Sequence, residues 1–154
     1  MLEAIAHSTE LAASCGIVSS ARDTDWTAKL VDVYPGPAQL TYNIADGILR
    51  ARYRLSLETP ELLKPGEVYE FTVDMLNTSN LFKKGHRIRI EISSSNFPQY
   101  DRNQNTGNAL FVDDEMVVAH QMIYHDKAHG SYVLLPIIPR DNTSSSASPE
   151  LSAR

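Results

Sequence analysis

The sequence is short of several features that would place it in a whole class of proteins. It holds a single cysteine, Cys15, so no disulfide can form within the chain and nothing favours an oxidising compartment. No apolar run approaches the roughly 18 residues of a membrane span. No basic flank precedes an apolar core near the N-terminus, so we expect no secretory signal and a cytoplasmic location.

Basic charge is also scarce. The chain has 14 Lys and Arg against 19 Asp and Glu, a net charge of −5, which argues against nucleic acid as a partner. The two basic clusters, Arg50–Arg54 and Lys83–Arg89, follow an alternating pattern typical of strands. We interpret both clusters as solvated faces of a sheet.

A nucleophile of the serine-hydrolase kind is missing. Such an enzyme places its serine in a G-x-S-x-G turn between a strand and a helix, and no such motif occurs here. Ser93, Ser94 and Ser95 follow a predicted strand, and we interpret them as residues that cap its end. We therefore predict no catalytic residues, no cofactor and no enzymatic activity of the isolated chain.

One group of metal-type side chains lies late in the chain and comprises His120, His125, Asp126 and His129. It spans a connection between two predicted strands, so local hydrogen bonds in a turn explain it better than a metal site. Asp101–Gly107 resembles the opening of a calcium loop, but Thr106 and Val112 stand where that loop needs Gly and Glu. We expect Asx-type hydrogen bonds there and no metal.

Alternating hydrophobicity and frequent Pro and Gly turns predict about seven short strands. These are Trp26–Tyr34, Gln39–Ile44, Ile48–Arg54, Val68–Met75, Arg87–Ile92, Glu115–Tyr124 and Ser131–Ile138. Asp46-Gly47 is a hairpin-type turn signal, and residues 1–14 show a weak helical pattern. The pattern indicates an all-β jelly-roll or Greek-key sandwich of the galactose-binding-like kind.

The expected organisation is one β-sandwich over residues 17–140, after an unmatched segment 1–16 and before a disordered tail 141–154. Whether the sandwich lacks its first strand is left open. Period-two faces predict a core that contains Leu30, Tyr69, Phe71, Val73, Ile88, Ile90, Ile92, Ile123 and Leu135.

The stretch Ser93–Gly107 is crowded with Ser, Asn, Asp, Pro and Gly, and follows a clean strand. It carries two aromatic residues, Phe97 and Tyr100. A long polar loop of this kind is how a β-scaffold presents a surface to another molecule. The aromatics either form an interface or pocket, or tuck back over the open end of the sandwich, and both readings stay open.

Several ordered segments together carry a family resemblance. They are Ser19–Val33, Asp46–Arg54, Leu63–Tyr69, Gly85–Pro98, Asp101–Asn103, Asn105–Gly107, Ile123–Asp126 and Leu135–Pro139. The chain resembles the C-terminal non-catalytic domain of the cocaine-esterase/NonD acyl hydrolases, relatives of the X-Pro dipeptidyl peptidases. The resemblance runs from Val18 to Arg140.

The resemblance implies a jelly-roll that packs on an α/β-hydrolase catalytic domain and helps to wall its substrate pocket. It places Asn96, Phe97, Pro98 and Tyr100 in the loop nearest the substrate, and the expected partner is the catalytic domain, absent from this chain. Self-association through the exposed packing surface is a further expectation. The alternatives are a stand-alone module that binds carbohydrate or peptide, or a fragment without function.

Overall fold

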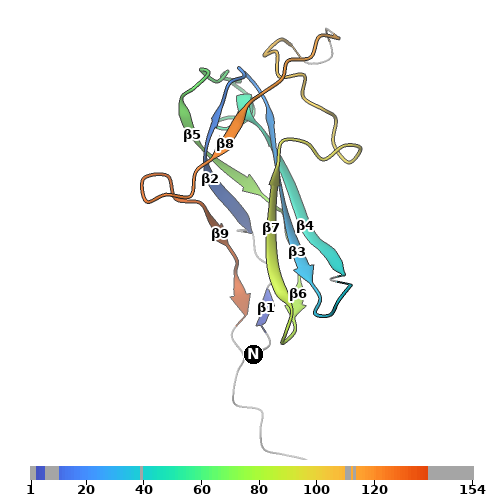
Figure 1. Ribbon diagram of the computed structural model, residues 1–154. Helices are drawn as coiled ribbons and strands as arrows, with labels where there is room; N and C mark the ends of the chain where they lie inside the picture. The colour runs from blue at the N-terminus through green and yellow to red at the C-terminus, as the bar shows by residue number, and fades with distance from the viewer. Residues whose placement is uncertain (1–2, 6–10, 39, 110–111, 113, 139–154) are drawn as a thin grey trace, which may run out of the picture.

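The computed structural model describes residues 3–5, 11–38, 40–109, 112 and 114–138 of the 154-residue chain. Its strands are β1 (Glu3–Ile5), β2 (Ala12–Ser19), β3 (Asp25–Val33), β4 (Thr41–Arg50), β5 (Val68–Asp74), β6 (Asn80–Phe82), β7 (Arg87–Ser93), β8 (Gln121–Ile123), β9 (Tyr132–Leu134) and β10 (Ile137–Ile138). A 3-10 turn, η1 (Ala51–Tyr53), follows β4. Figure 1 shows an elongated sandwich of antiparallel strands, and the predicted all-β fold is confirmed.

One sheet has the order β4-β3-β7, and β3 is its central strand. The strand predicted over Trp26–Tyr34 is confirmed, because β3 runs from Asp25 to Val33. Eight of its nine residues are buried. A central strand covered on both faces loses the simple alternation of buried and exposed residues, and β3 shows no period of two in its burial.

The second sheet has the order β5-β2-β8, and β9 also pairs with β2. The helical pattern expected in residues 1–14 is wrong for the described residues, because β1 and β2 are strands. β2 also crosses the boundary expected between residues 16 and 17. The space beside β2 is narrow and suits small residues, because a Cβ on Gly16 would lie 2.9 Å from Cβ of His129. The tail expected from residue 141 onward lies outside the described residues.

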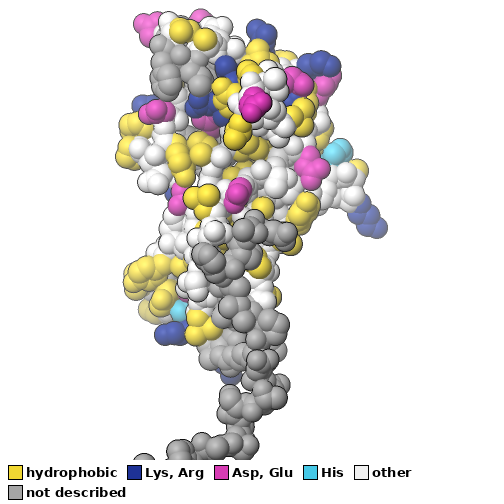
Figure 2. Space-filling view, turned by 180° about the vertical axis from the view of Figure 1, so that it is seen from behind, with side chains coloured by type: hydrophobic (Ala, Val, Ile, Leu, Met, Phe, Trp, Pro, Cys, Tyr) yellow, Lys and Arg dark blue, Asp and Glu magenta, His cyan; other side chains and the backbone are white. Residues whose placement is uncertain are grey.

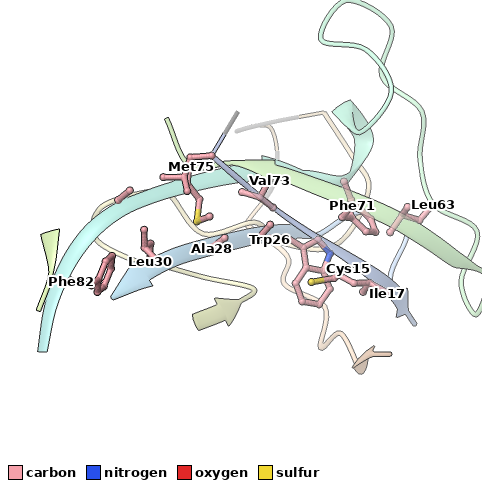
Figure 3. Packing of buried hydrophobic residues seen from close by; sticks show 14 residues of the cluster. Cys15, Ile17, Trp26, Ala28, Leu30, Leu63, Phe71, Val73, Met75 and Phe82 are labelled. Atoms are coloured by element: carbon pink, nitrogen blue, oxygen red, sulfur yellow. The ribbon is translucent and has the colours of Figure 1, made fainter. Parts of the chain in front are cut away.

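The core lies between these two sheets, and Figure 3 shows Trp26 and Cys15 packed side by side within it. Phe71 and Val73 of β5 and Leu30 of β3 are buried, as predicted. The other predicted core residues at the edge of this cluster are partly buried: Tyr69, Ile90, Ile92, Ile123 and Leu135. The prediction that Ile88 belongs to the core is wrong, because this residue is 46% exposed. It lies near the start of β7, whose first three residues are all exposed.

The hairpin turn predicted at Asp46-Gly47 is wrong, because β4 continues through both residues. Gly47 is needed for a close approach between the sheets instead. A Cβ at this position would lie 1.8 Å from the backbone oxygen of Asp74 at the end of β5. Glycine within a strand is a known sign that another backbone lies against it.

The last strands are shorter than predicted. Within Glu115–Tyr124 the described strand is β8 (Gln121–Ile123), and within Ser131–Ile138 two short strands, β9 and β10, are separated by Leu135-Pro136. Proline cannot donate a ladder hydrogen bond, so this break is expected from its chemistry. Among the described residues, no helix has the length and apolar character to cross a membrane.

Candidate functional site

The loop that leaves β7 is the candidate site, and it begins with hydrogen bonds between neighbouring residues. The Ser93 hydroxyl donates to the carbonyl oxygen of Ser95 at 3.0 Å, and the Ser95 amide approaches the Ser93 hydroxyl at 3.4 Å. These are strand-capping hydrogen bonds, as the sequence predicted.

Phe97 is held outward by this loop. Its side chain is 60% exposed, and the guanidinium of Arg102 lies 5.0 Å from the centre of its ring. Pro98 is exposed too, whereas Asn96 is partly buried and its carbonyl oxygen accepts the amide of Tyr100 at 3.2 Å. Phe97 therefore points away from the sandwich and does not tuck back over its end.

Tyr100 follows the other alternative and turns back onto the sheet. Its hydroxyl donates to Oδ2 of Asp46 on β4 at 2.9 Å. Desolvation raises the pKa of Tyr100, and the hydrogen bond to the Asp46 carboxylate and its negative charge raise it further. Tyr100 also lines a shallow cavity of about 280 Å³ with Ile48, Arg50 and Tyr53. The loop is therefore docked on β4 by one aromatic and presents the other.

A buried ionic network fixes the next part of the loop. Nδ2 of Asn103 donates to Oδ2 of Asp23 at 3.1 Å and to Oδ1 of Asp25 at 2.8 Å. Asp25 accepts two hydrogen bonds from the guanidinium of Arg50, at 2.8 and 2.9 Å. Asp23 accepts a hydrogen bond from Nε of Arg52 at 2.8 Å. The amide of Asn103 thus bridges two carboxylates that are each 1% exposed or less.

The same network corrects the interpretation of Arg50–Arg54 as a solvated face. Arg52 is 8% exposed and also donates to the carbonyl oxygen of Asn108 at 2.7 Å. The hydrogen bond to Asp25 raises the pKa of Arg50, against the desolvation that lowers it. Arg54 pairs with Glu61 and lies 4.5 Å from the centre of the Tyr69 ring. In the second basic cluster Lys83 and Arg89 are exposed, as predicted.

The turn chemistry expected elsewhere is present. Oδ1 of Asn103 accepts the amide of Asn105 at 2.8 Å, which is the Asx-type bond predicted for the loop that resembles a calcium site. Oδ1 of Asp126 accepts the amides of Ala128 and His129, both at 2.8 Å. The bond from His129 is the main reason that the pKa of Asp126 is lowered. In the described part of the chain no three His, Cys, Asp or Glu side chains form a metal-type cluster.

Sequence reasoning missed Asp23, Asp25, Arg52 and Asn103 as anchors of the loop. A signal was present in the sequence. Asp23 and Asp25 are two residues apart, and so are Arg50 and Arg52. The ladder pairs Asp25 with Arg50, which brings the acidic and basic pairs together. The signal could be interpreted only if β4 was known to pair with β3 along its whole length, including Asp46. The turn expected at Asp46-Gly47 hid that pairing.

Known proteins share this architecture. Residues 13–134 match the family of the X-Pro dipeptidyl-peptidase C-terminal non-catalytic domain. The cocaine esterase of Rhodococcus sp. (strain MB1 Bresler) is 50% identical over 126 residues, which cover 80% of this chain and 22% of that protein.

Two solved structures extend the comparison. An aminopeptidase from the marine sediment archaeon Thaumarchaeota archaeon has a TM-score of 0.76 at 28% identity, covering 90% of this chain and 26% of that chain. An α-amino acid ester hydrolase has a TM-score of 0.67 at 30% identity, covering 90% of this chain and 25% of that chain. The chain therefore spans about a fifth of the length of the curated relatives and about a quarter of these solved chains.

Proposed function

Because the chain belongs to the family of X-Pro dipeptidyl-peptidase C-terminal non-catalytic domains, we propose that it is the accessory β-sandwich of a serine acyl hydrolase. In this proposal it packs on an α/β-hydrolase catalytic domain, and the loop Asn96–Tyr100 forms part of the wall of the substrate pocket. The chain itself supplies no catalytic group to the hydrolysis of the acyl ester, amide or peptide.

The observation that carries the proposal is the contrast within one loop. Tyr100 and Asn103 bind the loop to Asp46, Asp23 and Asp25, yet Phe97 between β7 and these anchors remains 60% exposed. An aromatic that only covered its own sandwich would be buried. A rigidly presented aromatic loses little conformational entropy on binding, so it suits an interface or a pocket wall.

The rest of the surface supports a partner. Exposed large hydrophobic residues in the connecting loops include Leu55, Leu57, Met116 and Val118, each at least 59% exposed. Figure 2 shows several groups of hydrophobic side chains on the back face of the molecule, separated by charged ones. In the proposal these groups are the apolar surface available for packing on the catalytic domain.

A reconstitution experiment tests the proposal. The cocaine esterase from Rhodococcus, truncated to lack its own C-terminal domain, is mixed with this chain, and binding is followed by calorimetry and ester hydrolysis by product release. We expect the two parts to bind, the truncated esterase to gain activity, and the isolated chain to hydrolyse no ester. No binding at the highest soluble concentration of both parts would overturn the packing part of the proposal.

Two matched variants locate the contact. Phe97→Ser is expected to raise the Kd of the complex about tenfold or more, because a central aromatic carries much of an interface's binding energy. Leu40→Ser is the control, since Leu40 is 58% exposed but lies beside Tyr34, past the opposite end of β3. Equal effects of the two variants would count against a role for the loop.

A further inference from the structure

A groove lies on the outer face of the β5-β2-β8 sheet, beside the turn that joins β8 to β9. Its volume is about 480 Å³, in the range typical of small-molecule sites, and its lining includes Gly16, Glu70, His129 and Tyr132. Figure 1 shows the turn between β8 and β9 projecting from the left side of the sandwich. The residues that line the groove lie outside the loop that carries Phe97.

The floor of the groove is formed by Gly16 of β2. Its neighbours Cys15 and Ile17 belong to the core, so by alternation position 16 faces the outer side of the sheet. A Cβ at this position would lie 2.9 Å from Cβ of His129, so any larger residue would push the turn away from the strand. The glycine therefore allows the turn to lie directly on β2 and to form a wall of the groove.

Glu70 of β5 supplies an oriented carboxylate. Its Oε1 accepts a hydrogen bond from the hydroxyl of Ser14 at 2.8 Å, and Ser14 is 1% exposed. The hydroxyl of Thr72 donates in turn to Oγ of Ser14 at 3.3 Å. Glu70 itself is exposed. A buried hydroxyl thus fixes an acceptor at the groove, and an acceptor that is already oriented loses little entropy when a ligand binds.

His129 of the turn supplies an oriented imidazole. Its Nδ1 lies 3.2 Å from Oδ1 of Asp126, and the centre of its ring lies 4.8 Å from that of Tyr124. The backbone amide of His129 donates to the same oxygen of Asp126 at 2.8 Å. The side chain nevertheless remains 38% exposed. Because Nδ1 is directed at Asp126, Nε2 is the ring nitrogen that a ligand in the groove would meet.

Tyr132 of β9 supplies a flat apolar surface. It is 58% exposed, although its backbone pairs with Ser14 in the sheet. An aromatic ring presents a face on which the C–H groups of a ligand ring can pack, and the tyrosine hydroxyl adds a polar group at its edge. The groove thus combines one apolar face with polar groups that come from two other elements.

This combination of groups selects a class of ligand. The carboxylate of Glu70 accepts hydrogen bonds, whereas the ring of His129 offers a donor or an acceptor according to its tautomer. A ligand hydroxyl can donate to the first and can serve either form of the second. An ammonium group only donates and a ligand carboxylate only accepts. A sugar ring has hydroxyl groups around its rim and C–H groups on its faces, which fits both the polar groups and Tyr132.

We propose that this groove binds a neutral saccharide, with the sugar ring against Tyr132 and its hydroxyl groups bonded to Glu70 and His129. The inference does not depend on the proposed accessory function, because the groove and the Phe97 loop share no residue.

NMR chemical-shift mapping of the full chain tests the proposal, with glucose, galactose, maltose and cellobiose as separate probes. We expect one or more of these sugars to shift the backbone amides of Gly16, Glu70, Gly130 and Tyr132 in a saturable way. The amides of residues 93–107 should stay unchanged. Absence of shifts in the groove with all four sugars, up to the solubility limit of each, would overturn the proposal.

Two variants and two controls test the assigned contacts. Tyr132→Thr removes the flat ring but keeps a strand former, and Glu70→Gln removes the charge but leaves Ser14 an oxygen to bind. Each should raise the Kd of the sugar about tenfold. Tyr42→Thr and Glu91→Gln are the matched controls, since Tyr42 is 53% exposed and Glu91 is 44% exposed in the other sheet. Both controls should leave the Kd unchanged.

The remaining outcomes are also decisive. Sugar binding that both groove variants leave intact, or that the controls weaken equally, contradicts the assignment. Choline is the competing probe: if this cation shifts the amides of the groove and the sugars do not, the groove is a cation site and the proposal is wrong. The emission of Trp26 reports whether each variant is folded. If Tyr132→Thr unfolds the chain, Tyr132→Leu keeps an apolar residue without the flat ring and must weaken binding.

Discussion

Replacing Asp23 by Asn should strongly destabilise the fold, because this carboxylate is buried and neutralises a buried guanidinium. Asp23 is 0% exposed and accepts the amide of Arg52 at 3.0 Å, Nε of Arg52 at 2.8 Å and Nδ2 of Asn103 at 3.1 Å. The variant removes the negative charge and places an amide group among these donors. Asp25 cannot take over, since it is already bound to Arg50 at 2.8 and 2.9 Å.

The magnitude follows from the burial of both partners. Removing one member of a buried ion pair typically costs about 3–5 kcal/mol, since the remaining charge loses its partner without regaining water. The side chain of Arg52 is 10% exposed, so some hydration relieves it and the lower figure, about 3 kcal/mol, applies. For a chain of this size that loss lowers Tm by roughly 10 °C.

Urea unfolding followed by the emission of Trp26 measures this loss, because the chain has one tryptophan and it is 2% exposed in the core. Lys64→Gln is the control: it removes an exposed pair with Glu67, whose atoms lie 3.7 Å apart, and should cost less than about 1 kcal/mol. A loss from Asp23→Asn as small as that of the control would refute the argument from burial.

A second readout follows the loop. Asn103 is anchored by Asp23, and the exposed Arg102 precedes it in the chain. Trypsin should therefore cleave after Arg102 faster in Asp23→Asn than in the wild-type protein under conditions where both stay folded. Unchanged cleavage would show that the other contacts of the loop, among them Tyr100 with Asp46 and Asn103 with Asp25, hold it without Asp23.

Two further predictions concern local geometry and titration. Gly47→Ala should cost about 1–3 kcal/mol or more in urea unfolding, because its Cβ would lie 1.8 Å from the backbone oxygen of Asp74; Gly130→Ala, with nothing within 4 Å of its Cβ, is the control and should be nearly neutral. The raised pKa of Tyr100 favours the folded state below the pKa of an unfolded tyrosine, and this contribution is lost as the pH rises through the folded pKa. In an ultraviolet titration of the folded chain, Tyr100→Phe should remove a late phenolate step, and Asp46→Asn should move that step to lower pH.

The β5 strand shows what a local pattern can predict. Its alternation is regular, so Phe71 and Val73 could be assigned to the buried face without knowing any partner strand. β7 has the same alternation, yet Ile88 is exposed. Period two identifies residues that share a face, but the extent of burial depends on how far the opposing sheet reaches along the strand.

The Asp46-Gly47 pair shows where local reasoning fails. This dipeptide favours a hairpin turn when nothing else constrains it, but its glycine is also the residue that a neighbouring backbone can approach. The approach of Asp74 decides between the two, and that residue lies on β5 in the other sheet. The N-terminal strand β2 was missed for a related reason, because its small residues have weak strand propensity and are held by pairing on both sides.

The sequence by itself determined the all-β class, the positions of β3, β5 and β7, and the polar loop that carries Phe97 and Tyr100. Those features depend on periodicity and turn chemistry, which act over a few residues. Only the tertiary structure decided which aromatic points outward and which arginines are buried. Asn103 and Asp25 are 78 residues apart in the chain, so their contact is a property of the folded sheets. Burial of a charged group depends on partners that distant, and local patterns do not record them.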